Sequence, residues 1–176
     1  FDATLGKGYS GGKNVNVTAL ASGDKFGSAV ALDADANRLA VGAPGDDGSG
    51  NGVLDSGSVY LLSFSDAAFT GGAVTATLGA DYSGYDVTAL EANDAFGQAV
   101  ALAEASDGDH RLAVGATGDD GSGNSTSGSG AVYLFTFTNA SFAGDSLVAT
   151  IGSGYSGGSN VNNTSLAMDD YFGSGV

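Results

Sequence analysis

The sequence repeats itself with a period of about 73 residues, and this repeat limits the folds open to the chain. Residues 26–62 return as residues 96–135, and Tyr9, Tyr82 and Tyr155 are evenly spaced at that period. A unit that recurs at a fixed period is one supersecondary unit, which buries its apolar surface against its neighbours. We therefore expect the chain to be part of a longer array of repeats or of a polymer. The predicted domains are residues 1–73, residues 74–146 and a partial third repeat, residues 147–176.

Each repeat is predicted to contain four short strands. In the first repeat they span residues 3–6, 26–32, 38–43 and 58–64. Turn residues bound these apolar runs, and no 3.6-residue period indicates a helix. The last strand is apolar on both faces, which is typical of a strand covered on both sides. Val59 and Leu134 are predicted to lie inside the cores and Ser125 in a loop.

These strands predict an all-β fold class, with tandem four-stranded antiparallel blades of β-propeller type that recur every ~73 residues. The alternative is a β-sandwich, which would not require the repeat.

The repeated motifs resemble the FG-GAP repeat of integrin α-subunit propellers and related bacterial surface proteins. The motif residues are Phe26-Gly27, Gly42-Ala43-Pro44 and Val59-Tyr60, and then Phe96-Gly97, Gly115-Ala116-Thr117 and Val132-Tyr133. In that family several blades close a ring, and many blades carry a calcium loop of the form DxDxDGxxD between the FG and GAP strands. The resemblance implies extracellular adhesion or scaffold work without catalysis.

Composition narrows the function classes further. The chain has 20 acidic and 5 basic residues, a net charge of −15, which argues against nucleic acid as a partner. It has no cysteine, so neither disulfides nor a thiolate metal site can hold it together. There is no apolar run long enough to span a membrane. Neither an initiating methionine nor a signal peptide is visible, so we expect the sequence to be cut from a longer protein.

The calcium loop implied by the resemblance is degenerate in both repeats. In the first repeat Arg38 stands where the last carboxylate would be, and the copy also ends in an arginine, Arg111. A cation beside an arginine side chain is disfavoured, so we interpret both segments as hairpin turns. The candidate ligands that remain in these loops are Asp33, Asp35, Asn37, Asp107 and Asp109.

A second loop offers a more complete calcium pattern. Asp47, Ser49, Asn51 and Asp55 fit the spacing D-x-S-x-N-G-x-x-D, which places oxygens at alternate positions and a glycine at the sharp turn. The second copy lacks the glycine and the closing carboxylate. The alternative is a glycine-rich turn in which aspartate side chains cap backbone amides.

The polar residues do not indicate an enzyme. The Asp46–Asp47 and Asp119–Asp120 pairs recur at the same phase, which favours a structural role over an active site that is assembled once. His110 is the only histidine and has no nucleophile motif near it. Arg38 and Arg111 also share one phase, and we predict that each contacts a loop carboxylate through two hydrogen bonds.

Five Asn-x-Ser/Thr sequons are candidate glycosylation sites, all in segments predicted to be loops. They are Asn16, Asn124, Asn139, Asn162 and Asn163.

The sequence as a whole predicts a non-enzymatic extracellular repeat protein, acting as a surface adhesin or as a structural scaffold or filament component. The alternative is a calcium-dependent module that binds a protein or glycan. The expected partners are neighbouring repeats or identical chains, with an extracellular protein or glycan as a further candidate.

Overall fold

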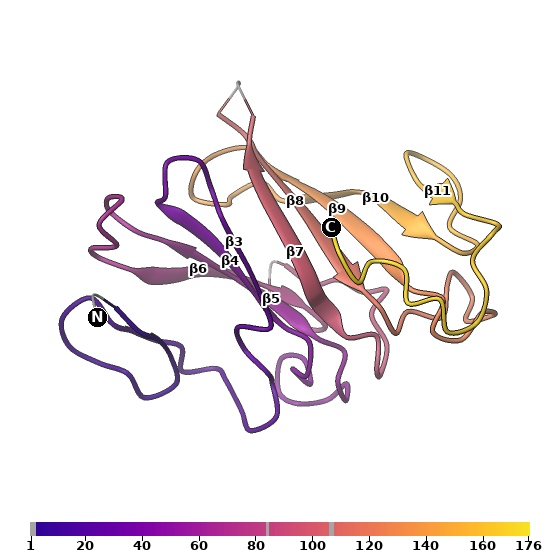
Figure 1. Ribbon diagram of the computed structural model, residues 1–176, viewed down its shortest axis with the longest axis horizontal. Helices are drawn as coiled ribbons and strands as arrows, with labels where there is room; N and C mark the ends of the chain where they lie inside the picture. Colours follow the sequence, from indigo (N-terminus) through magenta and orange to yellow (C-terminus); the bar gives the residue numbers. More distant parts are fainter. Residues whose placement is uncertain (1–2, 84, 106–107) are drawn as a thin grey trace.

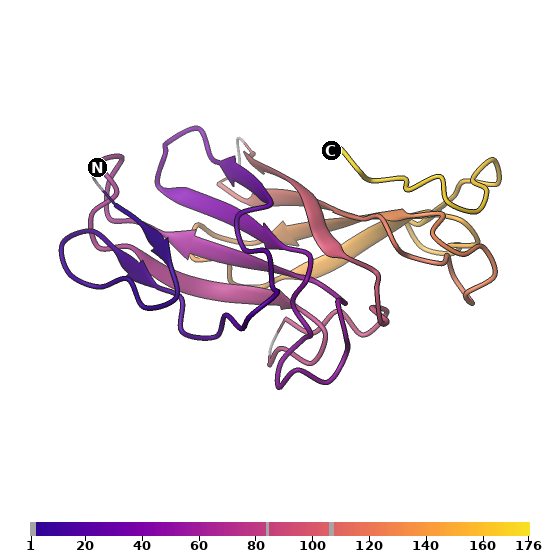
Figure 2. The same ribbon diagram turned by 60° about the horizontal axis from the view of Figure 1, so that its bottom comes forward.

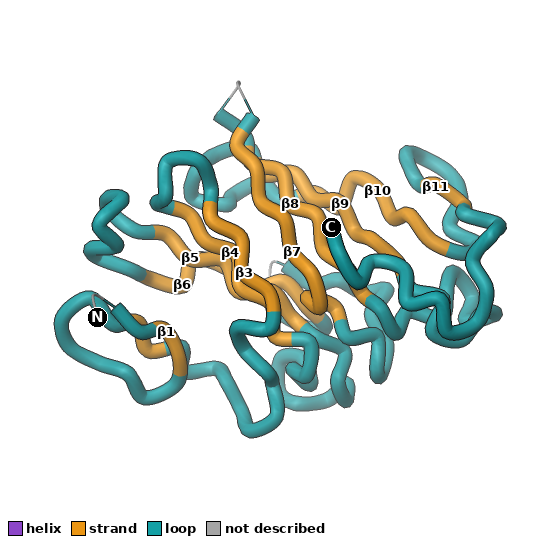
Figure 3. The backbone as a smooth tube through the Cα atoms, viewed as in Figure 1, coloured by secondary structure: helices purple, strands orange, loops and turns teal. Residues whose placement is uncertain are grey.

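The computed structural model describes residues 3–83, 85–105 and 108–176, and these residues form strands and loops without a helix (Figures 1 and 3). The predicted all-β class is therefore confirmed for the described part of the chain. The strands are β1 Leu5–Gly6, β2 Val15–Asn16, β3 Ala29–Leu32, β4 Arg38–Ala43, β5 Ser58–Ser63, β6 Ala73–Gly79, β7 Phe96–Glu104, β8 His110–Ala116, β9 Ala131–Phe137, β10 Ser146–Gly152 and β11 Val161–Asn162.

Two sheets dominate the structure. The first sheet has the order β3-β4-β5-β6 and the second has the order β11-β10-β9-β8-β7. Neighbouring strands are antiparallel, except that β11 runs parallel to β10. The short β1–β2 pair is also parallel, and its register, Leu5 with Val15, matches Ile151 with Val161 in the second sheet. The two ends of the described chain therefore share one local motif.

The sheets are offset from the sequence repeat. β6 and β10 were expected to open the second and third repeats, but each one closes the sheet of the repeat before it. The reason is the short connection that precedes β6. Asp66 accepts hydrogen bonds from the backbone N of Ala68 (3.0 Å) and Thr70 (3.1 Å), which folds the chain back from β5 to β6. Strands joined by so short a turn pair as antiparallel neighbours.

The second sheet stacks on the first through β7, which lies across β3 and β4 (Figures 1 and 2). The main apolar core lies between the two sheets. Val59 and Leu61 of the first sheet are fully buried in it, together with Leu112 and Val114 of the second sheet. Val59 is thus a core residue as predicted. Leu134 is only half-buried, because its face of the second sheet looks away from the first sheet.

Glycines at the crossing point explain the FG and GAP motifs. A Cβ atom on Gly42 would lie 2.0 Å from the carbonyl oxygen of Gly97, so only glycine lets the two backbones approach this closely. The same approach recurs between Gly115 and Gly173, where the distance would be 1.8 Å. The third FG pair therefore lies on the second sheet in the way that the second FG pair lies on the first.

A second core covers the other face of the first sheet. Val15, Val17 and Leu20 of the N-terminal segment pack there with Val41 and Tyr60. This segment leaves part of the face exposed, including Val30 and Leu32 of β3.

Candidate functional site

A buried aspartate–tyrosine network lies in each of the two sheets. The Asp46 carboxylate accepts hydrogen bonds from the hydroxyls of Tyr60 (2.8 Å) and Tyr82 (3.1 Å) and from the backbone N of Gly48 (2.9 Å). Asp46 is 3% exposed, so these donors replace the water that its charge would otherwise require. The network connects the loop between β4 and β5, which contains Asp46, to β5 itself and to the loop that follows β6.

The second repeat contains the same network. Asp119 accepts hydrogen bonds from the hydroxyls of Tyr133 (2.6 Å) and Tyr155 (2.8 Å) and from the backbone N of Gly121 (2.8 Å). Burial, with the nearby aspartate charge, raises the pKa of Tyr82 to about 12 and raises the pKa of the other three tyrosines as well. All four phenols therefore remain protonated donors at neutral pH. A network built once per repeat fits the predicted structural role of the Asp-Asp pairs.

A turn closed by an aspartate side chain precedes each of the three FG pairs. The carboxylates of Asp24, Asp94 and Asp170 accept hydrogen bonds from the backbone N three residues earlier, at 2.6, 2.7 and 2.8 Å. Such side-chain bonds close a turn. Burial, together with the nearby charges of Asp119 and Glu91, raises the pKa of Asp94 to about 7. Burial likewise raises the pKa of Asp24.

The loop with the fuller calcium pattern is an ordered turn. Asp47 Oδ1 accepts a hydrogen bond from the backbone N of Asp55 (2.7 Å), and Asp55 Oδ1 lies 3.9 Å from Lys25 Nζ. Asp120 Oδ1 accepts the equivalent hydrogen bond from Gly128 N (2.7 Å) in the second copy, which lacks the closing carboxylate. Both aspartates therefore cap backbone amides, as in the alternative interpretation of this loop as a glycine-rich turn. Ser49 and Asn51 are exposed on the same loop, and calcium binding there stays a prediction.

The first degenerate family loop is a tight hairpin turn between β3 and β4. Asp33 Oδ1 accepts hydrogen bonds from the backbone N of Asn37 and Arg38, both at 2.9 Å, while Asp35 is exposed. In the second copy, Asp107 lies outside the described residues. Asp109 Oδ2 lies 3.5 Å from Arg111 Nη1.

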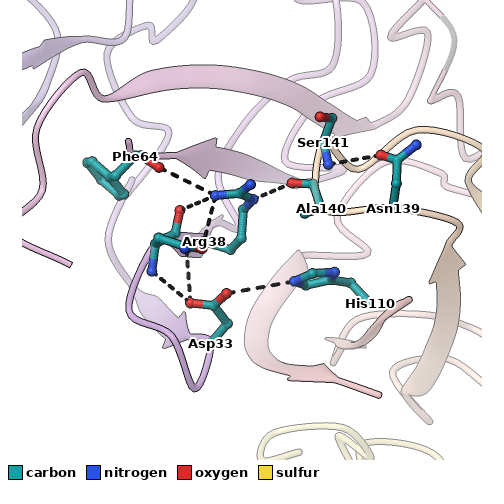
Figure 4. Close-up of polar contacts among 8 residues, drawn as sticks. Asp33, Arg38, Phe64, His110, Asn139, Ala140 and Ser141 are labelled. Atoms are coloured by element: carbon teal, nitrogen blue, oxygen red, sulfur yellow. Dashed lines mark hydrogen bonds and ion pairs between the residues drawn. The ribbon is translucent and has the colours of Figure 1, made fainter. Parts of the chain in front are cut away.

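The two arginines do not share one type of contact. Arg111 faces the Asp109 carboxylate, which is a loop carboxylate as predicted, and the pair of hydrogen bonds stays a prediction. The prediction is wrong for Arg38, whose guanidinium donates to the backbone carbonyls of Ala140, Asn37 and Phe64 (Figure 4). Because Ala140 belongs to the loop after β9, Arg38 connects the two sheets.

The sequon asparagines all have side-chain roles in local structure. Asn16 and Asn162, expected in loops, lie in the short strands β2 and β11, where each Oδ1 accepts a backbone N–H, from Gly8 and Gly154 respectively. Asn139 and Asn163 cap turns, and Asn124 Nδ2 donates to Glu91. Asn163 is partly buried, and the other four are exposed. Glycosylation of these residues stays a prediction.

Two apolar sheet faces are open to solvent. On the first sheet Val30 is 59% and Leu32 41% exposed. On the second sheet a shallow apolar hollow includes Ala113, Leu134 and Val148. No helix formed by the described residues has the length and apolar character to cross a membrane.

The chain belongs to the FG-GAP repeat family. The family model matches residues 20–62 and 90–135, which together make up just over half of the 176 residues. These matches cover almost all of β3 to β5 and of β7 to β9, so both sheets contain the family unit. FG-GAP repeats occur in extracellular adhesion-type proteins, and the family is in general a non-catalytic repeat or binding module. A search of curated proteins found no match to the chain.

Proposed function

We propose that this chain is a segment of a non-enzymatic extracellular repeat array that serves as a surface adhesin or structural scaffold. Each sheet acts as a β-propeller-type blade, and the blades work by stacking on one another. Family membership supports this class of function. The repeated networks of Asp46 and Asp119 also support it, because they bind the structure together and do not form a single catalytic centre.

One observation carries the proposal: the same sheet face is covered in the first repeat and open in the second. Ala40 and Leu61 on the first sheet are fully buried under the second sheet. Their equivalents one repeat later, Ala113 and Leu134, are half-buried around an apolar hollow. Since equivalent side chains form equivalent surfaces, a further blade of the same kind fits the open face.

That blade would come from the next repeat of a longer chain or from an identical chain. Exposed apolar surface of this kind is characteristic of an interaction site. On the first sheet, Val30 and Leu32 form the reciprocal surface, since they are the equivalents of Val100 and Leu102 in β7, which packs on the first sheet. The two open faces are therefore complementary, and identical chains can associate head to tail through them.

We expect the chain, expressed alone, to self-associate reversibly as its concentration rises, which sedimentation equilibrium would measure. Leu134→Asp should weaken the association because it places a charge in the apolar hollow. Ser125→Asp, in an exposed loop, is the matched control and should associate as the wild type does. A monodisperse monomer whose unfolding midpoint does not depend on concentration would overturn the proposal.

The same experiment tests the alternative, a calcium-dependent binding module. The proposed stacking is apolar, so removing calcium with a chelator should leave the association unchanged. Association that disappears with the chelator and also with Asp47→Ala would instead favour calcium at Asp47, Ser49, Asn51 and Asp55.

A further inference from the structure

A cluster of three side chains joins the two sheets. Asp33 lies in the turn between β3 and β4, Glu104 is the last residue of β7, and His110 is the first residue of β8. One potential ligand atom from each side chain lies within 4.8 Å of the others. This cluster does not belong to the stacking surfaces or to the aspartate–tyrosine networks described above.

His110 shows that the cluster is incomplete. The side chain is 1% exposed, and neither of its ring nitrogens has a hydrogen-bond partner. The imidazole packs against the Phe142 ring, with a centroid distance of 5.5 Å, so apolar contacts hold it in place. Buried polar groups without partners are rare in native structures, and each one calls for a water, an ion or a functional role.

Asp33 presents one oxygen to this imidazole. Its Oδ1 accepts the backbone hydrogen bonds that close the turn, which fixes the carboxylate. Its Oδ2 lies 3.7 Å from His110 Nε2, too far for a hydrogen bond. Two ligand atoms on a tetrahedral metal with bonds of about 2.0 Å lie roughly 3.3 Å apart. A small adjustment of the two side chains would therefore place an ion between them.

The charges around the cluster also suit a cation. Asp33 and Glu104 supply two carboxylates beside a histidine that can bind a metal as neutral imidazole. The guanidinium of Arg38 donates to backbone carbonyls, away from the free oxygen of Asp33 (Figure 4). Glu104 is exposed, which gives an ion a route from solvent to the two buried ligands.

The cluster occurs once, unlike the structural networks. In the aligned repeats Asp33 corresponds to Ala103, Glu104 to Ala34, and His110 to Asn37. No equivalent set of ligands can therefore form in the other copies of the repeat. A feature that the repeat does not require is more consistent with a special role at this junction than with general packing.

We propose that Asp33, Glu104 and His110 form a binding site for a borderline divalent transition metal, with Zn²⁺ as the test ion, and that the bound ion links the two sheets. One imidazole nitrogen and two carboxylate oxygens form a three-ligand set that zinc accepts, with water in the fourth position. Calcium prefers six to eight oxygen ligands, so it should bind weakly at this site. The site is distinct from the calcium loop implied by the family resemblance, because two of its ligands come from the second sheet.

The test is calorimetric titration of the metal-free chain with Zn²⁺, with visible absorption of bound Co²⁺ as a second readout. We expect one ion per chain and a Co²⁺ spectrum of tetrahedral type. His110→Phe, Asp33→Asn and Glu104→Gln should each weaken Zn²⁺ binding by at least about tenfold, because even the loss of an outer-shell partner of a metal ligand costs about 10–100-fold. Zn²⁺ should raise the thermal unfolding midpoint of the wild type but not that of His110→Phe.

Two features keep the test decisive. Phenylalanine at position 110 retains the packing on Phe142, and asparagine at position 33 retains the oxygen that closes the turn, so both variants should fold without metal. Asp35→Asn, in the same turn but exposed, is the matched control and should bind Zn²⁺ as the wild type does. The absence of saturable binding, or undiminished binding by both His110→Phe and Asp33→Asn, would overturn the proposal. The stacking proposal would be unaffected, because it depends on Leu134 and not on this cluster.

Discussion

Leu61→Asp is expected to abolish folding, whereas Leu134→Asp should leave the isolated chain folded. The two leucines occupy the same phase of successive repeats. Leu61 is fully buried between the sheets, so an aspartate there would be an unpaired charge in an apolar core. That substitution costs several kcal/mol, a large part of the roughly 5–15 kcal/mol that stabilises a typical domain. Leu134 is half-buried on an open face, where water can solvate the new charge.

Urea unfolding followed by circular dichroism, at a concentration where the chain is monomeric, would measure both effects. Leu61→Asp should lack a cooperative transition, and Leu134→Asp should retain one. Ser125→Asp is exposed and should unfold like the wild type. Equal loss of stability in the two leucine variants would show that the two faces are equally covered, which contradicts the stacking described here.

Asp46→Ala should give the next largest loss of stability. It removes the acceptor for two buried tyrosine hydroxyls and for the backbone N of Gly48. The groups left without an acceptor are neutral donors, and each buried donor left unsatisfied costs about 1–3 kcal/mol. Asp119→Ala should cost a similar amount, since the second network has the same donors. Urea melts of the variants would supply the free energies of unfolding.

Two milder variants make this prediction specific. Tyr60→Phe removes one donor and leaves Asp46 with the other two, so it should cost about 1–3 kcal/mol. Asp35→Ala changes an exposed carboxylate and should lie within about 0.5 kcal/mol of the wild type. A loss below about 1 kcal/mol for Asp46→Ala would mean that the network contributes little to folding.

Much of the fold follows from patterns along the sequence. The short apolar runs predicted strands that match β4 fully and β5 to within one residue. Phe26 was expected to begin a strand, but β3 starts at Ala29, whereas β7 does begin at the equivalent Phe96. The offset of the sheets was missed because a period gives the length of a repeat but not where its structural unit begins. Only the short turn held by Asp66 places β6 with β5.

The polar sites were harder to predict because their contacts are remote in sequence. Tyr82 and Asp46 are 36 residues apart, although their shared recurrence with Tyr155 and Asp119 was a usable signal. Asp33 and His110 come from different repeats and recur in neither, so no periodic pattern could connect them. The carboxylate contact of Arg38 was predicted from its charge and from the phase that it shares with Arg111. Its carbonyl partner, on Ala140, becomes available only when the second sheet is in place.

The most direct test of blade stacking is disulfide cross-linking between two variants, since the chain has no native cysteine. Val100 and Ala31 lie in one apolar cluster where β7 packs on β3, and their repeat equivalents are Val30 and Ala101 on the two open faces. We expect Val30→Cys and Ala101→Cys chains, when mixed and oxidised at a concentration that supports association, to form a mixed disulfide in preference to either homodimer. Homodimers alone, or no cross-link under those conditions, would contradict head-to-tail stacking through these faces.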